Sequence, residues 1–130
     1  MDDIRDKHDV KIFVDAFYGK VRIDPLIGPV FAARIEDDRW SIHLERMYSF
    51  WNTVLFAERD YQGNPFAKHS SLPIEAPHFE RWIKLLSETL DEHFEGEKAE
   101  EVKMRAIKMG ALFQSKLEYI RANDNFENLM

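Results

Sequence analysis

Histidine is the residue type in this sequence that points most directly to metal chemistry, and two of the five histidines lie where an interior site could form. His43 lies one turn before Met47 on the apolar side of an expected helix. His69 ends a short segment that leads into a loop bounded by Pro73 and Pro77. A neutral imidazole binds iron through one ring nitrogen while a nearby acceptor orients the other nitrogen. These two histidines are therefore candidate iron ligands.

Neither histidine is informative alone, because a histidine on an apolar helix face is more often a hydrogen-bonded core residue than a ligand. Together they are more informative, since 26 residues separate them and the intervening helix and loop could fold back around a flat group. Aromatic side chains flank both, and ten phenylalanines supply more flat apolar surface than a small helical core requires. We therefore hypothesise a haem between them. His8 and His93 lie in charged surroundings and are expected in solvent, and His78 is expected to cap or cover a helix start.

The spacing of apolar residues predicts a single all-helical domain over residues 1–130, with an ordered core of about 4–121 and a frayed polar tail over 122–130. Helices are expected over about 6–21, 30–35, 39–57, 77–94 and 97–121. Prolines and a glycine interrupt the pattern over 23–29, and residues 58–65 have the composition of a surface turn. Asp37 and Asp38 are the expected N-caps of the helix that follows them.

The composition excludes several classes of function. A net charge of -6 without a basic stripe argues against a nucleic-acid partner. The absence of cysteine excludes disulfides and thiolate metal sites, and the acidic N-terminus and the lack of a long apolar run predict a cytoplasmic protein without a membrane span. No glycine-rich phosphate loop, His-Glu-x-x-His zinc pair or nucleophile elbow is present.

Several segments of the chain, in a fixed order over about residues 4–120, match a known family. They are FYGKVR (17–22), GPVF (28–31), Trp40 with His43, FW (50–51), DYQGNP (60–65), KH (68–69) followed by LP (72–73), and FERWIKL (79–85). In these segments the chain resembles the truncated haemoglobins, and specifically their third group. The glycine–glycine turns typical of the first two groups are absent, which is itself a feature of the third group.

The resemblance implies a shortened globin fold, a two-over-two helical sandwich around haem b (iron protoporphyrin IX). It implies that His69 is the proximal ligand of the haem iron. On the opposite side, His43 would be the distal histidine, and Tyr18 and Trp82 would donate hydrogen bonds to a ligand of the haem.

Further residues are implied to line or back the pocket, namely Phe31, Met47, Phe50 and Trp51. Met47 stands where the family often has a branched aliphatic residue, so the resemblance does not fix the shape of the distal cavity. Haem propionates require cations near the rim of the pocket. The candidates are Arg46, Lys68 and Arg81.

Three functions remain open at this stage. The first is a haem-binding globin that reversibly binds oxygen, nitric oxide or carbon monoxide at a five-coordinate iron with a polar distal pocket. The second is a haem enzyme that detoxifies nitric oxide or reduces peroxide, with electrons from a separate reductase, because the chain has no flavin or nicotinamide domain. The third is a helical interaction module that has lost haem, against which the presence of His69 and Tyr18 argues.

Overall fold

The computed structural model describes residues 1–57 and 75–129, and this part of the chain is helical without strands. The elements are α1 (Lys7–Ile23), α2 (Gly28–Arg34), the short 3-10 helix η1 (Asp37–Arg39), α3 (Trp40–Phe56), α5 (Ala76–His93) and α6 (Glu97–Leu129). The all-helical prediction is confirmed. His69 and Lys68 lie outside the described residues.

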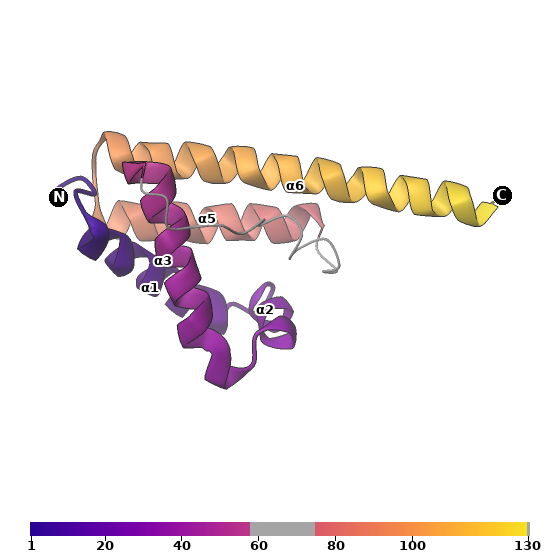
Figure 1. Cartoon of the computed structure of the whole chain (residues 1–130), viewed down its shortest axis with the longest axis horizontal. Helices are drawn as coiled ribbons and strands as arrows, with labels where there is room; N and C mark the ends of the chain where they lie inside the picture. Colours follow the sequence, from indigo (N-terminus) through magenta and orange to yellow (C-terminus); the bar gives the residue numbers. More distant parts are fainter. Residues whose placement is uncertain (58–74, 130) are drawn as a thin grey trace.

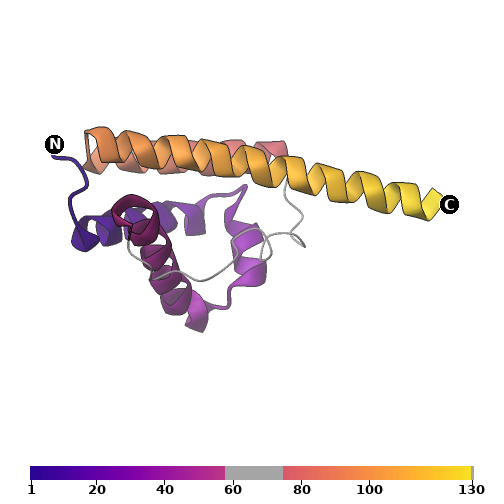
Figure 2. The same ribbon diagram turned by 45° about the horizontal axis from the view of Figure 1, so that its top comes forward.

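The helices form two layers, which are clearest in Figure 2. Helices α5 and α6 lie side by side and antiparallel in one layer, and α1 and α3 cross in the other (Figure 1). Helix α1 contacts α3, α5 and α2, and α3 also contacts α6. The predicted two-over-two sandwich is therefore confirmed. None of the helices in residues 1–57 and 75–129 is long and apolar enough to cross a membrane.

Local side-chain hydrogen bonds explain where two of the helices begin. Asp6 caps α1 by accepting a hydrogen bond from the backbone N–H of Asp9 at 3.1 Å. At the start of α5, Glu75 and His78 form a reciprocal capping box, in which His78 Nδ1 accepts the backbone N–H of Glu75 at 3.0 Å. The predicted capping role of His78 is confirmed. Pro77 occupies the first turn, where its missing N–H leaves no intrahelical bond unmade.

The predicted N-caps of α3 are wrong. Asp37 and Asp38 form the 3-10 helix η1, and Arg39 occupies the N-cap position of α3 without a side-chain capping bond. The reason is that the chain enters α3 through this extra turn, closed by the bond from Arg39 N–H to the carbonyl of Glu36 at 2.8 Å. Both aspartates therefore precede the position at which a side chain could cap the helix.

The predicted end of the last helix is also wrong, because α6 continues to Leu129 instead of ending near residue 121. The residues beyond 121 are polar, but none of them is proline or glycine, so nothing in this stretch interrupts helical backbone. The far end of α6 extends past the rest of the molecule in Figure 1.

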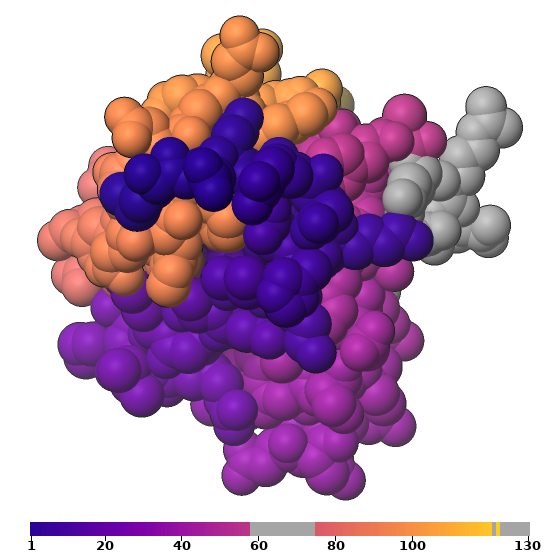
Figure 3. All heavy atoms as spheres, turned by 90° about the vertical axis from the view of Figure 1, so that its left-hand side faces the viewer, coloured from indigo at the N-terminus to yellow at the C-terminus, as the bar shows by residue number. Residues whose placement is uncertain are grey.

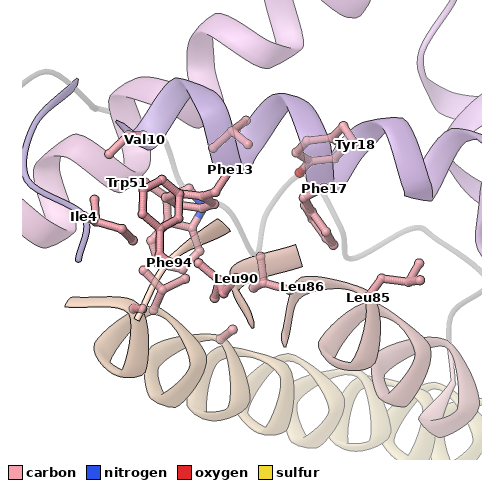
Figure 4. Packing of buried hydrophobic residues seen from close by; sticks show 14 of the residues in the cluster. Ile4, Val10, Phe13, Phe17, Tyr18, Trp51, Leu85, Leu86, Leu90 and Phe94 are labelled. Carbon is pink, nitrogen blue, oxygen red and sulfur yellow. The ribbon is translucent and has the colours of Figure 1, made fainter. Parts of the chain in front are cut away.

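The core lies between the two layers and is rich in aromatic side chains. Phe13 and Phe17 of α1 face Leu86 and Leu90 of α5, and Trp51 of α3 joins them (Figure 4). The rings of Phe13 and Trp51 pack edge to face with centroids 5.9 Å apart. This packing fixes α1, α3 and α5 relative to one another.

Helix α2 lies tightly against the end of α1. A Cβ atom at Gly28 would come within 3.0 Å of the Val21 carbonyl oxygen and 3.1 Å of that of Arg22, so glycine permits this close approach. The short helix is thereby held beside the residues of α1 that precede it.

Candidate functional site

A cavity of about 320 Å³ opens between the layers, and all five α-helices in the described part of the chain contribute to its wall. This volume falls in the range typical of small-molecule sites. Of the described residues predicted for the site, all but Arg81 line this cavity: Tyr18, Phe31, His43, Arg46, Met47, Phe50, Trp51 and Trp82. The structure thus brings together residues that lie up to 64 positions apart in the sequence.

Tyr18 comes from α1 and is almost completely buried, with 6% of its surface exposed. Burial raises the pKa of its hydroxyl well above the ordinary value of 10. The hydroxyl therefore stays protonated at neutral pH and can act as a hydrogen-bond donor.

His43 comes from α3 and packs against Tyr18. The two rings meet edge to face, with centroids 5.0 Å apart and an interplanar angle of 90°. Trp40 lies one turn earlier on α3 and also packs edge to face on His43, with ring centroids 5.6 Å apart. These contacts hold the imidazole among aromatic rings at the wall of the cavity.

Trp82 comes from α5, in the opposite layer. Its ring contacts Phe17 edge to face, with centroids 5.9 Å apart. Since Phe17 precedes Tyr18 on α1, the same turn of α1 contributes the hydroxyl donor and supports the indole donor. Three groups that can donate hydrogen bonds, from three helices, therefore line one aromatic cavity.

Known proteins resemble this chain in sequence and in structure. Residues 1–113 match the family model described as bacterial-like globin. The chain belongs to the bacterial-like globins. It is 36% identical over 107 residues to a group 3 truncated haemoglobin from Campylobacter jejuni, a match that covers 80% of this chain and 84% of that protein.

The crystal structure of the group III truncated haemoglobin from Campylobacter jejuni superposes on this globin with a TM-score of 0.80 and 33% identity. The match covers 87% of this chain and 91% of the crystallised chain. The predicted family, the third group of truncated haemoglobins, and its shortened globin fold are thus confirmed. As a member of this family, the protein is a haem-binding globin.

The wall of the cavity in this globin also carries basic side chains. Arg46 of α3, predicted as a propionate contact, lines the cavity, and so do Arg34 of α2 and His78 of α5, which were not predicted as site residues. Apolar walls, a side with hydrogen-bond donors and several basic side chains fit a flat apolar group that carries carboxylates, which is the chemistry of haem.

Arg81 does not line the cavity. Its guanidinium Nη1 lies 3.1 Å from Oδ1 of Asp24, a buried carboxylate at the end of α1. The structure therefore gives no support to Arg81 as a propionate contact, because its side chain is already engaged in an ion pair between α1 and α5. The predicted roles of His69 and Lys68 fall outside the described residues.

The sequence does not identify the remaining residues of the cavity wall, because they lie on helix faces with the pattern of ordinary core. Helix α6 contributes Met109, Gly110 and Phe113, and α5 contributes Phe79 and Leu86. Their helical spacing predicts burial but does not distinguish a core contact from a cavity wall.

Proposed function

We propose that this globin reversibly binds oxygen and other diatomic gases, with His69 as the proximal ligand of haem b and with Tyr18, Trp82 and His43 around the bound gas. Haem iron supplies the affinity for the gas, and the protein sets how long the gas stays. The observation that carries this proposal is that all three predicted distal residues line one cavity, although they come from three helices.

The role of Tyr18 follows from its burial. A gas molecule that takes up negative charge on binding is stabilised by a donor aimed at it, and a neutral donor contributes about 1 kcal/mol, or about fivefold in affinity. The raised pKa of Tyr18 keeps its proton in place at neutral pH. Trp82 has only an indole N–H and can donate but not accept. Two such donors favour slow release, which suits a trap or a reaction site better than a carrier that must unload.

The rim of the site has candidate partners for the propionates. Arg46 and Arg34 supply positive charge. His78 uses Nδ1 as the acceptor for the backbone of Glu75, so its neutral ring carries the proton on Nε2, which is then a donor. We assign these three residues in place of Arg81, and Lys68 remains a candidate.

Reversibility is tested by cycling the reduced protein between oxygen and argon while its absorption spectrum is recorded. Repeated return of the reduced spectrum is the expected result. Conversion to the ferric form in a single cycle would contradict reversible binding.

The enzyme alternative makes a different prediction in the same sample. Sustained consumption of nitric oxide or peroxide in the presence of an added reductant would favour it. The proposed electron donor for this activity in the cell is a separate reductase. The cytoplasm is the location that we propose for either function.

A further inference from the structure

An ion pair joins the two helices that carry the distal donors. Asp24 directly follows α1, six residues after Tyr18, and Arg81 directly precedes Trp82 on α5. Nη1 of Arg81 lies 3.1 Å from Oδ1 of Asp24. The carboxylate side chain is 5% exposed, and that of the arginine is 38% exposed. The pair is therefore partly shielded from water and stronger than an ordinary surface pair.

The carboxylate of Asp24 is held by the main chain as well as by Arg81. Its Oδ2 accepts the backbone N–H groups of Leu26 and Ile27, each at 3.0 Å. The backbone carbonyl of Asp24 accepts the N–H of Gly28, the first residue of α2, at 2.9 Å. Asp24 is thus a fixed anchor, and these bonds do not depend on the arginine.

Arg81 is placed where it can orient its neighbour. Successive residues on a helix point about 100° apart, so Arg81 and Trp82 meet α1 and its end from two directions. Arg81 reaches Asp24 beyond the end of α1, and Trp82 contacts Phe17 within α1. Two contacts from adjacent residues restrict both the rotation of α5 about its axis and its position along α1.

We propose that the Asp24–Arg81 pair is a positioning device that holds the indole of Trp82 over the cavity and so slows release of the bound gas. This inference rests on the proposed function, in which Trp82 donates a hydrogen bond to that gas. Arg81 acts through Trp82 and does not itself line the cavity.

The chain supplies a matched control. Lys20 and Glu92 also join α1 to α5, with Nζ 2.6 Å from Oε1. Glu92 lies ten residues beyond Trp82, about 15 Å along the helix. Glu92→Gln therefore removes an ion pair between the same two helices far from the indole.

The first experiment measures oxygen dissociation from the haem-loaded protein in a double-mutant cycle. Arg81→Met is expected to speed release severalfold, Arg81→Lys to restore part of the wild-type rate, and Glu92→Gln to leave the rate unchanged. In the Trp82→Phe background, Arg81→Met should have no further effect. An equal acceleration with and without Trp82 would overturn the inference, because the pair would then act through general packing.

The second experiment needs no gas. The indole N–H resonance of Trp82 is recorded in the 15N-labelled full chain before haem is added, and is identified by its loss in Trp82→Phe. Arg81→Met should shift this resonance, and Glu92→Gln should not. An unshifted resonance in Arg81→Met overturns the positioning role.

The two experiments separate this inference from the proposed function. If Trp82→Phe leaves oxygen release unchanged, the donor role of Trp82 fails, while a shifted indole resonance in Arg81→Met still supports the positioning role.

Discussion

At the scale of single residues, Tyr18, the proposed distal tyrosine, carries the clearest prediction. Tyr18→Phe removes a buried donor and leaves the ring that packs on Phe31 and His43. Loss of one neutral hydrogen bond of about 1 kcal/mol should speed oxygen release by about fivefold, measured by stopped-flow displacement with carbon monoxide.

Tyr48 offers the matched control for this substitution. Its hydroxyl donates to the carboxylate of Asp15 between α3 and α1, and it does not line the cavity. Tyr48→Phe should lower stability and leave oxygen release unchanged. Equal release rates in wild type and Tyr18→Phe would assign the main donor role to Trp82 or His43 instead.

The proposed proximal ligand carries a second prediction at this scale. His69→Ala should abolish stable haem binding, because it removes the proposed bond between the protein and the iron. Haem content per chain after gel filtration, from the pyridine haemochrome spectrum, measures the effect. His93→Ala is the control, since His93 is exposed at the end of α5. Full haem occupancy in the His69 variant would contradict the assignment.

The three residues predicted as distal line one cavity in the structure, whereas the predicted positions of the cations needed the structure to be resolved. Tyr18, His43 and Trp82 could be assigned from the resemblance because each stands in a recognisable motif. Arg81 stands in such a motif too, yet its long flexible side chain could reach either the cavity or Asp24. The ion pair with the buried carboxylate of Asp24, which apolar spacing does not reveal, shows that Arg81 contacts Asp24.

At the scale of secondary-structure elements, the N-terminal segment holds the start of α6. The carboxylate of Asp3 accepts the backbone N–H groups of Lys98 and Ala99 at 2.8 and 2.9 Å, and the segment covers the first turns of α6 in Figure 3. Gly96 allows this approach, because a Cβ atom there would lie 2.4 Å from Cγ of Asp3. Asp3 thus acts as an N-cap from a distant part of the chain.

This cap predicts a loss of stability in Asp3→Ala. The substitution should lower the free energy of unfolding by about 1 kcal/mol, measured by urea denaturation at pH 7. Asp2→Ala is the control, because the carboxylate of Asp2 is exposed and lies 3.5 Å from the guanidinium of Arg5 on the surface. Equal destabilisation by both substitutions would show that the cap contributes nothing specific.

The same cap predicts how stability depends on pH. Burial raises the pKa of Asp3, but hydrogen bonds from the backbone of Lys98, Ala99 and Ile4 outweigh it, so the pKa is lowered below 3.8 in the folded state. A carboxyl group whose pKa is lowered by folding stabilises the folded state at pH values above its pKa in the unfolded chain. This contribution is lost as the pH falls through its pKa in the folded state. The difference in unfolding free energy between wild type and Asp3→Ala should therefore shrink below about pH 4. A difference that stays the same from pH 7 to pH 2 would contradict this assignment.

The helices themselves show the limits of sequence patterns. Apolar spacing predicted α1, α3 and α5 to within a few residues, because each buries a face against the other layer. It failed at Asp37 and Asp38, since a capping residue type does not reveal an intervening 3-10 turn. It also failed at the end of α6. The polar residues beyond 121 were taken to mark the end of the helix, but no proline or glycine interrupts the helical backbone there.

At the scale of the whole molecule, the cavity exists because two layers of helices meet around it. No single helix supplies more than a part of its wall, so its contents depend on the complete fold. The central claim is that this fold holds a haem whose iron is open to gases.

An absorption spectrum of the purified protein tests that claim most directly, recorded as purified, after reduction, and after exposure to carbon monoxide. We predict a haem spectrum that shifts when carbon monoxide is added to the reduced protein. A protein that shows no haem absorption, even after addition of haemin, would contradict the claim.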